Sequence, residues 1–143
     1  QVYKSAESYY ADLQAIHDRV LRVTGKDSKI IRFPGGSSNT ISANYSPHIM
    51  TFLAQDVQAK GYTYFDWNVS SGDGDSGKLS PQALYDAVVN NLNINRENVV
   101  LMHDTNHNTL KALHNIIEYG KNNGYQFRAI DSSTPPIHHP INN

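Results

Sequence analysis

Hydrophobic residues recur along this chain in two alternating patterns, one typical of helices and one typical of buried strands. Tyr9, Leu13, Ile16 and Val20 follow the helical spacing, which ends at Gly25. Similar stripes predict three further helices, near residues 47–61, 80–92 and 108–124. For the last helix, the side chains expected to face the core are Leu110, Leu113, Ile116 and Ile117.

Short apolar runs separate these helices and predict four strands, over residues 30–33, 64–69, 99–102 and 125–130. The order α-β-α-β-α-β-α-β predicts an α/β fold whose strands run parallel. Such a chain can form an open sheet or the later part of a (β/α) barrel, and its opening on a helix favours the barrel. The proline-rich segment 131–143 is expected to be an extended tail on the surface, with His138 and His139 exposed to solvent.

Composition narrows the classes of partner. The chain has 143 residues, enough for one domain with its own core. Because its 12 basic and 13 acidic residues nearly balance, net charge gives no support for a nucleic-acid partner. No apolar run is long enough to span a membrane. The chain has no cysteine, which excludes disulfides and thiolate metal sites, and its many tyrosines and asparagines suit neutral polar ligands such as sugars.

Three of the predicted strands end abruptly in polar residues. The first carries Arg32 to its end and runs into Pro34-Gly35-Gly36. On the second, period-2 alternation places Asp66, Asn68 and Ser70 on the face opposite Trp67, and the third runs into His103. Since parallel strands in βα units meet their ligands at the carboxyl ends, these positions predict one shared site.

Each of these residues suggests both a chemical role and a structural one. Arg32 stands among apolar neighbours, so we expect it to be buried against a carboxylate, either as a structural salt bridge or to orient a catalytic group. The amides around Gly35 could stabilise an oxyanion, or they could belong to an ordinary loop. His103 suits a general acid. His107 and His114 do not share a face with it that would favour a metal site.

The three segments Arg-Phe-Pro-Gly-Gly-Ser-Ser-Asn, Asp-Trp-Asn-Val-Ser-Ser-Gly-Asp and Val-Leu-Met-His-Asp-Thr resemble the last three motifs of the polysaccharide deacetylases. This is the NodB-homology group, carbohydrate esterase family 4, and the closest resemblance is to bacterial peptidoglycan N-acetylglucosamine deacetylases. The resemblance covers nearly the whole chain. It implies a distorted (β/α) barrel and a hydrolase that removes acetyl groups from N-acetylated glycans with the help of a divalent metal, typically zinc.

The resemblance also implies roles for individual residues. Arg32 would hold the catalytic aspartate base, and the Gly35 amide would stabilise the tetrahedral oxyanion. Leu101 would line the acetyl pocket, Trp67 would lie beside the substrate, and His103 would protonate the departing amine.

This chain departs from the family pattern in its middle motif. Many relatives pair the acid histidine with an aspartate three residues after the tryptophan, where this chain has Ser70. Gly74 stands where a second tryptophan is common. Asp66 or Asp73 is therefore expected to serve as the partner of His103, and the sequence leaves the choice open.

The first two family motifs, Thr-Phe-Asp-Asp-Gly and His-x-x-x-His, do not occur here. In the family they supply the base and the metal ligands. We therefore expect residues 1–143 to be the C-terminal portion of one deacetylase domain, inactive alone, with the metal held outside this chain. The rest of the barrel would come from the same protein or from a companion polypeptide.

Three readings of function follow. The first is a bacterial extracellular or cell-surface deacetylase of peptidoglycan or a chitin-like glycan. The second is a catalytically inactive carbohydrate-binding fragment. The third is an α/β phosphate- or nucleotide-binding domain that uses the glycine-rich loop, although the P-loop lysine spacing is absent.

Overall fold

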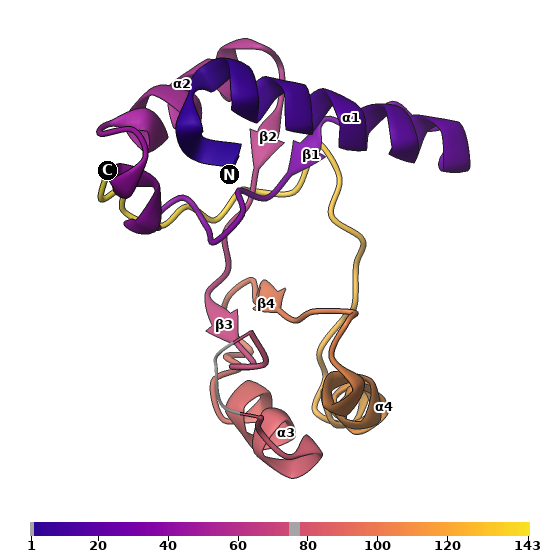
Figure 1. Ribbon diagram of the computed structural model, residues 1–143. Helices are drawn as coiled ribbons and strands as arrows, with labels where there is room; N and C mark the ends of the chain where they lie inside the picture. The colour runs from indigo at the N-terminus through magenta and orange to yellow at the C-terminus, as the bar shows by residue number, and fades with distance from the viewer. Residues whose placement is uncertain (1, 75–77) are drawn as a thin grey trace. The chain divides into compact units, whose positions relative to one another are not determined.

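The computed structural model describes residues 2–74 and 78–143, and the chain divides into two compact units. The first unit comprises the residues up to Asp66 together with Asp131–Asn143, and the second comprises Trp67–Ile130. Figure 1 shows the elements of each unit. In the first unit they are η1 (Val2–Lys4), α1 (Ala6–Thr24), β1 (Ile30–Ile31), η2 (Ile41–Asn44), α2 (Ile49–Ala59) and β2 (Thr63–Tyr64). In the second they are β3 (Val69–Ser70), α3 (Pro81–Val89), β4 (Val100–Leu101) and α4 (His107–Asn122).

The first unit is built around a parallel pair of strands, β1 and β2, in which Ile30 lies opposite Thr63. Its core is largely aromatic, because Tyr9 of α1 packs against Phe33, and Phe33 packs against Tyr64. Of the four residues with helical spacing in α1, Tyr9 and Leu13 are buried, Val20 is half-buried and Ile16 is 52% exposed. The amphipathic pattern of α1 therefore continues beyond the part that this core covers.

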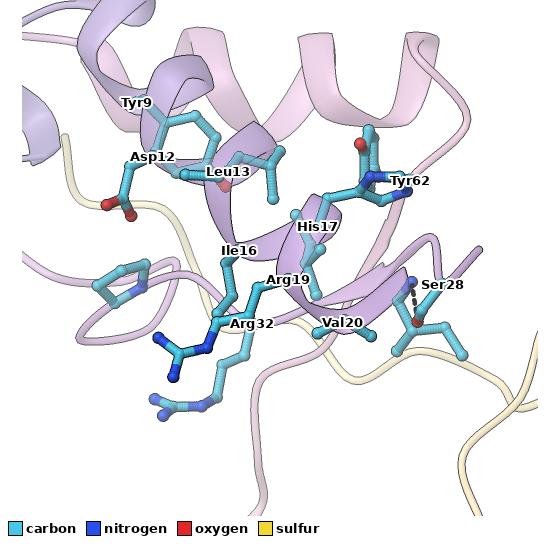
Figure 2. A pocket seen from close by; sticks show the side chains of 14 residues that line it. Tyr9, Asp12, Leu13, Ile16, His17, Arg19, Val20, Ser28, Arg32 and Tyr62 are labelled. Carbon is cyan, nitrogen blue, oxygen red and sulfur yellow. Dashed lines mark hydrogen bonds between the residues drawn. The ribbon is translucent and has the colours of Figure 1, made fainter. Parts of the chain in front are cut away.

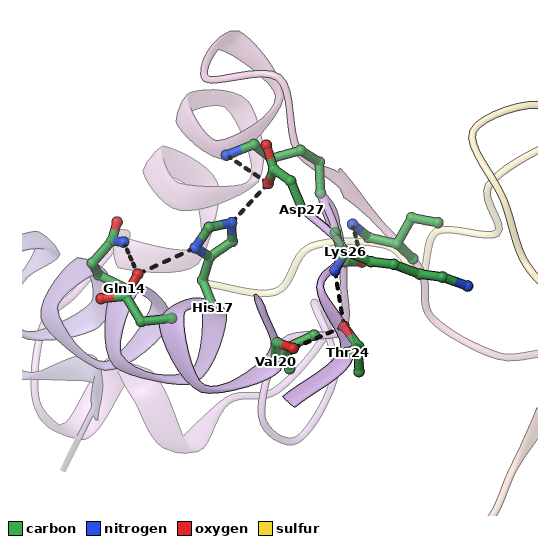
Figure 3. A network of polar contacts seen from close by, with 10 residues as sticks. Gln14, His17, Val20, Thr24, Lys26 and Asp27 are labelled. Carbon is green, nitrogen blue, oxygen red and sulfur yellow. Dashed lines mark hydrogen bonds and ion pairs between the residues drawn. The ribbon is translucent and has the colours of Figure 1, made fainter. Parts of the chain in front are cut away.

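Polar contacts close the C-terminal end of α1 (Figure 3). Gly25 adopts the left-handed conformation (φ 70°) and its amide donates to the Leu21 carbonyl, as expected for a glycine that ends a helix. His17 reaches Asp27 through Nε2 at 2.7 Å. Hydrogen bonds from the His17 ring to the carboxylate of Asp27, and to a lesser degree to that of Asp18, raise the pKa of His17. These contacts fix the turn that leads from α1 into β1.

The second unit pairs β3 with β4, again in parallel, with Val69 opposite Val100. The predicted start of α3 is confirmed: Ser80 caps it by accepting a hydrogen bond from the Ala83 amide, and Pro81 is its first residue. Helices α3 and α4 pack together over a core formed by Val69, Leu84, Val88, Ala112 and Ile116.

The orientation of α4 differs from the prediction. The helix begins at His107, slightly earlier than predicted, with Asn106 as its N-cap. Leu110 is 65% exposed and Leu113 is 37% exposed, so the prediction that both face the core is wrong. The buried stripe runs instead through Thr109, Ala112, Ile116 and Gly120. The cause lies in the first turn, where Thr109 bonds to a buried carboxylate described below.

Two predicted strands also differ from the structure. The predicted strand 64–69 is interrupted, and its two ends belong to the separate strands β2 and β3. Ser70 is consequently exposed instead of facing inward with Asp66. Residues 125–130, predicted as the fourth strand, form no strand. The Phe127 ring packs instead against Gly120 of α4, and a Cβ on Gly120 would lie 2.6 Å from this ring. The segment therefore lies against the helix instead of joining a sheet.

Parallel pairing between predicted strands is thus confirmed in both units, within a mixed α/β architecture. In the part of the chain that the structure describes, no helix is long and apolar enough to cross a bilayer. The segment 131–143 has no regular secondary structure, as predicted for a tail, but it is firmly attached to the first unit. His138 is exposed, as predicted, and its ring stacks on Tyr64 with a centroid distance of 3.8 Å. His139 is partly buried, which corrects the prediction for that residue.

Candidate active site

A carboxylate and an imidazole are paired where β4 ends in the second unit. His103 follows this strand, and its Nδ1 lies 2.8 Å from Asp73 Oδ1. The backbone amide of His103 donates to the other oxygen of the same carboxyl group at 2.7 Å. The Asp73 side chain is 1% exposed, whereas the His103 side chain is 34% exposed. The ring is therefore held from its buried side, and Nε2 is the nitrogen that can face a ligand.

The carboxyl group of Asp73 is itself held by neighbouring groups. The Thr109 hydroxyl of α4 donates to Oδ2 at 2.6 Å, and the Asn106 side chain donates to the Asp73 carbonyl at 3.0 Å. Burial alone raises the pKa of Asp73, but the hydrogen bonds from Thr109 and His103 outweigh it and lower the pKa to about 2. Asp73 is therefore negatively charged at neutral pH. Sequence reasoning missed Asn106 and Thr109, although an asparagine directly before an amphipathic helical segment is a favoured N-cap.

This geometry decides which aspartate pairs with His103. Asp73 does so, whereas Asp66 lies at the end of the first unit. Asp66 is 1% exposed, and its carboxyl group accepts hydrogen bonds from the amide and the hydroxyl of Ser37. Asp66 is therefore not the partner of the candidate acid, which corrects one of the two alternatives.

The glycine-rich loop forms a tight turn after β1. Gly35 and Gly36 both have positive φ, 77° and 81°, and the Gly36 amide donates to the Phe33 carbonyl at 2.8 Å. Glycine is required here because other residues rarely adopt this conformation. A Cβ on Gly35 would also lie 3.3 Å from the Asn39 side chain. Gly35 is exposed, and among the residues that the structure describes no acceptor takes its amide, so this amide can donate to a ligand.

The expectation that Arg32 is buried is wrong, because its side chain is exposed. It lines a pocket of about 560 Å³ between α1 and β1, together with Arg19, Ile16 and Tyr62 (Figure 2). Arg32 follows Ile31, the last residue of β1, and precedes the fully buried Phe33. Since side chains alternate in extended backbone, the Arg32 side chain points away from the aromatic core. Burial therefore does not force a carboxylate on Arg32, and its catalytic role stays a prediction.

The remaining predicted residues lie in the second unit. Leu101 is the last residue of β4 and is half-buried, and Trp67 is the first residue of the unit and is also half-buried. Their contact with an acetyl group or a sugar stays a prediction. The same holds for the convergence of Arg32 and Gly35 with His103 on one ligand, since the first two belong to the other unit.

Metal ligands were not expected within this chain. In the described ranges 2–74 and 78–143, no three histidine, aspartate or glutamate side chains come together in a way that could hold a metal ion. The described residues therefore do not fit a metal site, and the chemistry derived below is limited to the groups that are present.

Gly74 leaves room for the imidazole of His103. A Cβ on Gly74 would lie 2.7 Å from His103 Cε1, and Gly74 does not have a positive φ, so alanine is otherwise compatible with the backbone. We expect Gly74→Ala to turn the ring away from Asp73 and to lower the free energy of unfolding by about 1 kcal/mol. A double-mutant cycle with His103→Ala tests this, because the cost should vanish once the ring is gone. An equal cost in both backgrounds would show that the ring is not the obstacle.

Comparisons with known proteins bear on this site. No model of a protein family matches the chain. The chain is 42% identical to the catalytic domain of peptidoglycan N-acetylglucosamine deacetylase from Eubacterium rectale, with a TM-score of 0.97 over 100% of this chain and 65% of that one. A polysaccharide deacetylase from Bacillus cereus is 26% identical, with a TM-score of 0.67 over 99% of this chain and 64% of that one.

The curated relatives agree with these structures. The chain is 26% identical over 145 residues to the peptidoglycan-N-acetylglucosamine deacetylase of Bacillus cereus, covering 99% of this chain and 49% of that protein. It spans about half the length of the curated relatives it matches. The resemblance inferred from the three motifs is therefore confirmed: the homologues of this chain are polysaccharide and peptidoglycan N-acetylglucosamine deacetylases of carbohydrate esterase family 4.

Proposed function

We propose that this chain takes part in the metal-dependent removal of acetyl groups from an N-acetylated glycan, either peptidoglycan or a chitin-like polymer of N-acetylglucosamine. His103 is the general acid that protonates the leaving sugar amine. Asp73 orients its imidazole, and the Gly35 amide donates to the oxyanion formed from the acetyl carbonyl. Leu101 contacts the acetyl methyl group, Trp67 contacts the sugar, and Arg32 holds a catalytic aspartate outside this chain.

One observation carries the proposal: a buried carboxylate directs both of its oxygens to His103. Burying a charge is costly, and a surface that only binds sugar has no need to fix one imidazole in this way. A general acid does need it, because proton transfer depends on where the donor atom lies. The pair therefore favours the hydrolase over the inactive carbohydrate-binding fragment.

The turn at Gly35 supports the same proposal. The amide of the exposed residue Gly35 lacks an acceptor in the described part of the chain, so it can donate to an oxygen that gains negative charge during the reaction. Its position is set by the backbone before the substrate arrives, so the donor needs no rearrangement. A phosphate group would also accept a hydrogen bond from this amide, but a phosphate-binding function would not explain the pairing of Asp73 with His103.

The divalent metal, zinc by the family resemblance, belongs to the proposal as a group held by residues outside this chain. The glycan substrate and a location outside the bacterial cell or on its surface are proposed on the same resemblance. Residues 1–143 would then be the part of the deacetylase domain that carries the acid and the oxyanion donor.

The proposal is tested by comparing two proteins, residues 1–143 alone and the full-length protein that contains them. Both are incubated with N-acetylglucosamine oligomers and zinc, and the released acetate is measured. We expect release from the full-length protein and none from the isolated chain, because metal and base are lacking there. A chelator should abolish the release, and added zinc should restore it.

Two results would contradict the proposal in different ways. Zinc-dependent release by residues 1–143 alone would show that this chain needs no metal ligands from elsewhere. A folded, zinc-loaded full-length protein that releases no acetate from peptidoglycan or chitin oligomers would refute the deacetylase activity.

A further inference from the structure

Asp66 is the most enclosed charged residue in the first unit and has no role in the chemistry proposed above. It follows β2 and is 1% exposed. Oδ1 accepts the Ser37 amide at 2.8 Å, and Oδ2 accepts both the Ser37 hydroxyl and the His139 amide, the latter at 2.8 Å. One carboxyl group thus joins the segment after the glycine turn to a segment roughly a hundred residues later in the chain.

The later segment lies along the free side of β2. In a strand, successive amides point to opposite sides. On one side, the amides of Thr63 and Phe65 donate to the carbonyls of Lys29 and Ile31, which belong to β1 and the residue before it. On the other side, the Asp66 amide donates to the Ile137 carbonyl at 2.7 Å. We call residues 137–143 the C-terminal clasp.

The clasp also contacts the glycine-rich loop and the start of α2. Ser38 Oγ lies 3.1 Å from His139 Nδ1, and the Asn142 side chain donates to the Ser38 carbonyl at 3.0 Å. Asn143 accepts the His48 amide through its side chain and the Thr51 amide through its carbonyl, each at 2.7 Å. Because His48 makes no side-chain cap on α2, Asn143 supplies the missing acceptors for that helix.

We infer that Asp66 is a positioning residue for the oxyanion donor: with the C-terminal clasp, it fixes the turn that carries the Gly35 amide. The inference deepens the proposed function and rests on it for the role of Gly35. Gly35 and Gly36 can adopt many conformations, so the turn needs an external constraint to hold one of them. Ser37 provides this constraint, because its amide and its hydroxyl both donate to the Asp66 carboxyl group.

The test replaces Asp66 with asparagine in the full-length protein. An amide has one accepting oxygen, so it can keep the bond from the Ser37 amide, but its NH₂ group then faces the His139 N–H, and two donors meet. We expect kcat to fall about 10- to 100-fold with little change in KM, because a displaced oxyanion donor weakens binding of the transition state more than that of the substrate. Amide hydrogen exchange should become about 10-fold faster, or more, at Gly36, Ser37 and His139.

A second pair of variants keeps the inference testable if Asp66→Asn does not fold. His139→Ala and His139→Pro both lose the imidazole, but only proline also removes the N–H that Asp66 accepts. The proline variant should show the lower kcat and the faster exchange at Gly36 and Ser37. In both quantities the alanine variant should differ less from the wild type.

The two readouts separate failure of this inference from failure of the proposed function. Unchanged exchange at Gly36 and Ser37 in a folded Asp66→Asn protein, or in His139→Pro compared with His139→Ala, would overturn the constraint. Faster exchange with unchanged kcat would reduce Asp66 to a structural residue and overturn its positioning role. A wild-type protein without deacetylase activity would refute the proposed function and with it the role of Gly35, whereas the exchange data would still decide whether Asp66 constrains the turn.

Discussion

Replacing His103 with glutamine in the full-length protein is expected to lower the turnover of N-acetylglucosamine oligomers by about 100- to 10,000-fold. Glutamine can still hydrogen-bond Asp73 but cannot deliver a proton, and an amine leaves poorly without one. The free energy of unfolding should change little, because the His103 side chain is 34% exposed and its removal leaves no large cavity.

The acid role can be separated from a general disturbance of the site by the choice of substrate. An aryl acetate releases a phenolate, which leaves without protonation, so the same variant should lose far less activity on that ester. His114→Gln is the matched control, since His114 is an exposed histidine on α4. Equal losses on amide and ester, or full turnover of the glycan, would remove the acid assignment.

Asp73→Asn is expected to impair both activity and stability. The asparagine removes the charge that orients His103 and leaves three nearby donors with a single accepting oxygen, so turnover should fall about 100-fold or more. Because the hydrogen bonds lower the pKa of Asp73 from 3.8 to about 2, the ionised carboxylate stabilises the folded state by about 2 kcal/mol at pH 7.

The pH dependence fixes the sign of that contribution. For a carboxyl group with a lowered pKa, the stabilisation is complete above the unfolded value of 3.8 and disappears as the pH falls toward 2. Denaturant unfolding from pH 7 to pH 2 should therefore show the wild type losing its advantage over Asp73→Asn within this window. Asp104→Asn, an exposed neighbour of His103, is the control. A difference between wild type and Asp73→Asn that keeps its full size at pH 2 would show that the charge is not its source.

Local patterns were sufficient for the presence of the four α-helices and for the start of α3 and the end of α1, but not for the buried face of α4. Ser80-Pro81 marks the start of α3 and Gly25 ends α1, because capping groups act on backbone atoms only a few residues away. The strands were harder to predict, since the structure forms them only as two-residue pairs, and pairing depends on a distant partner. Residues 125–130 are apolar enough for a strand, yet Phe127 packs on Gly120 instead, a choice that no local pattern records.

The sequence by itself indicated the family of the chain's homologues, the candidate acid His103, the glycine turn and the two aspartates from which the partner of His103 had to come. Only the tertiary structure showed that Asp73, and not Asp66, pairs with His103, and that Arg32 is exposed. It also placed Thr109 against the Asp73 carboxylate and the C-terminal clasp against the Asp66 carboxylate. The physical reason is the range of the interactions involved. Chain motifs and helix caps are local, whereas a buried carboxylate takes its hydrogen-bond donors from whichever distant segments the fold places around it.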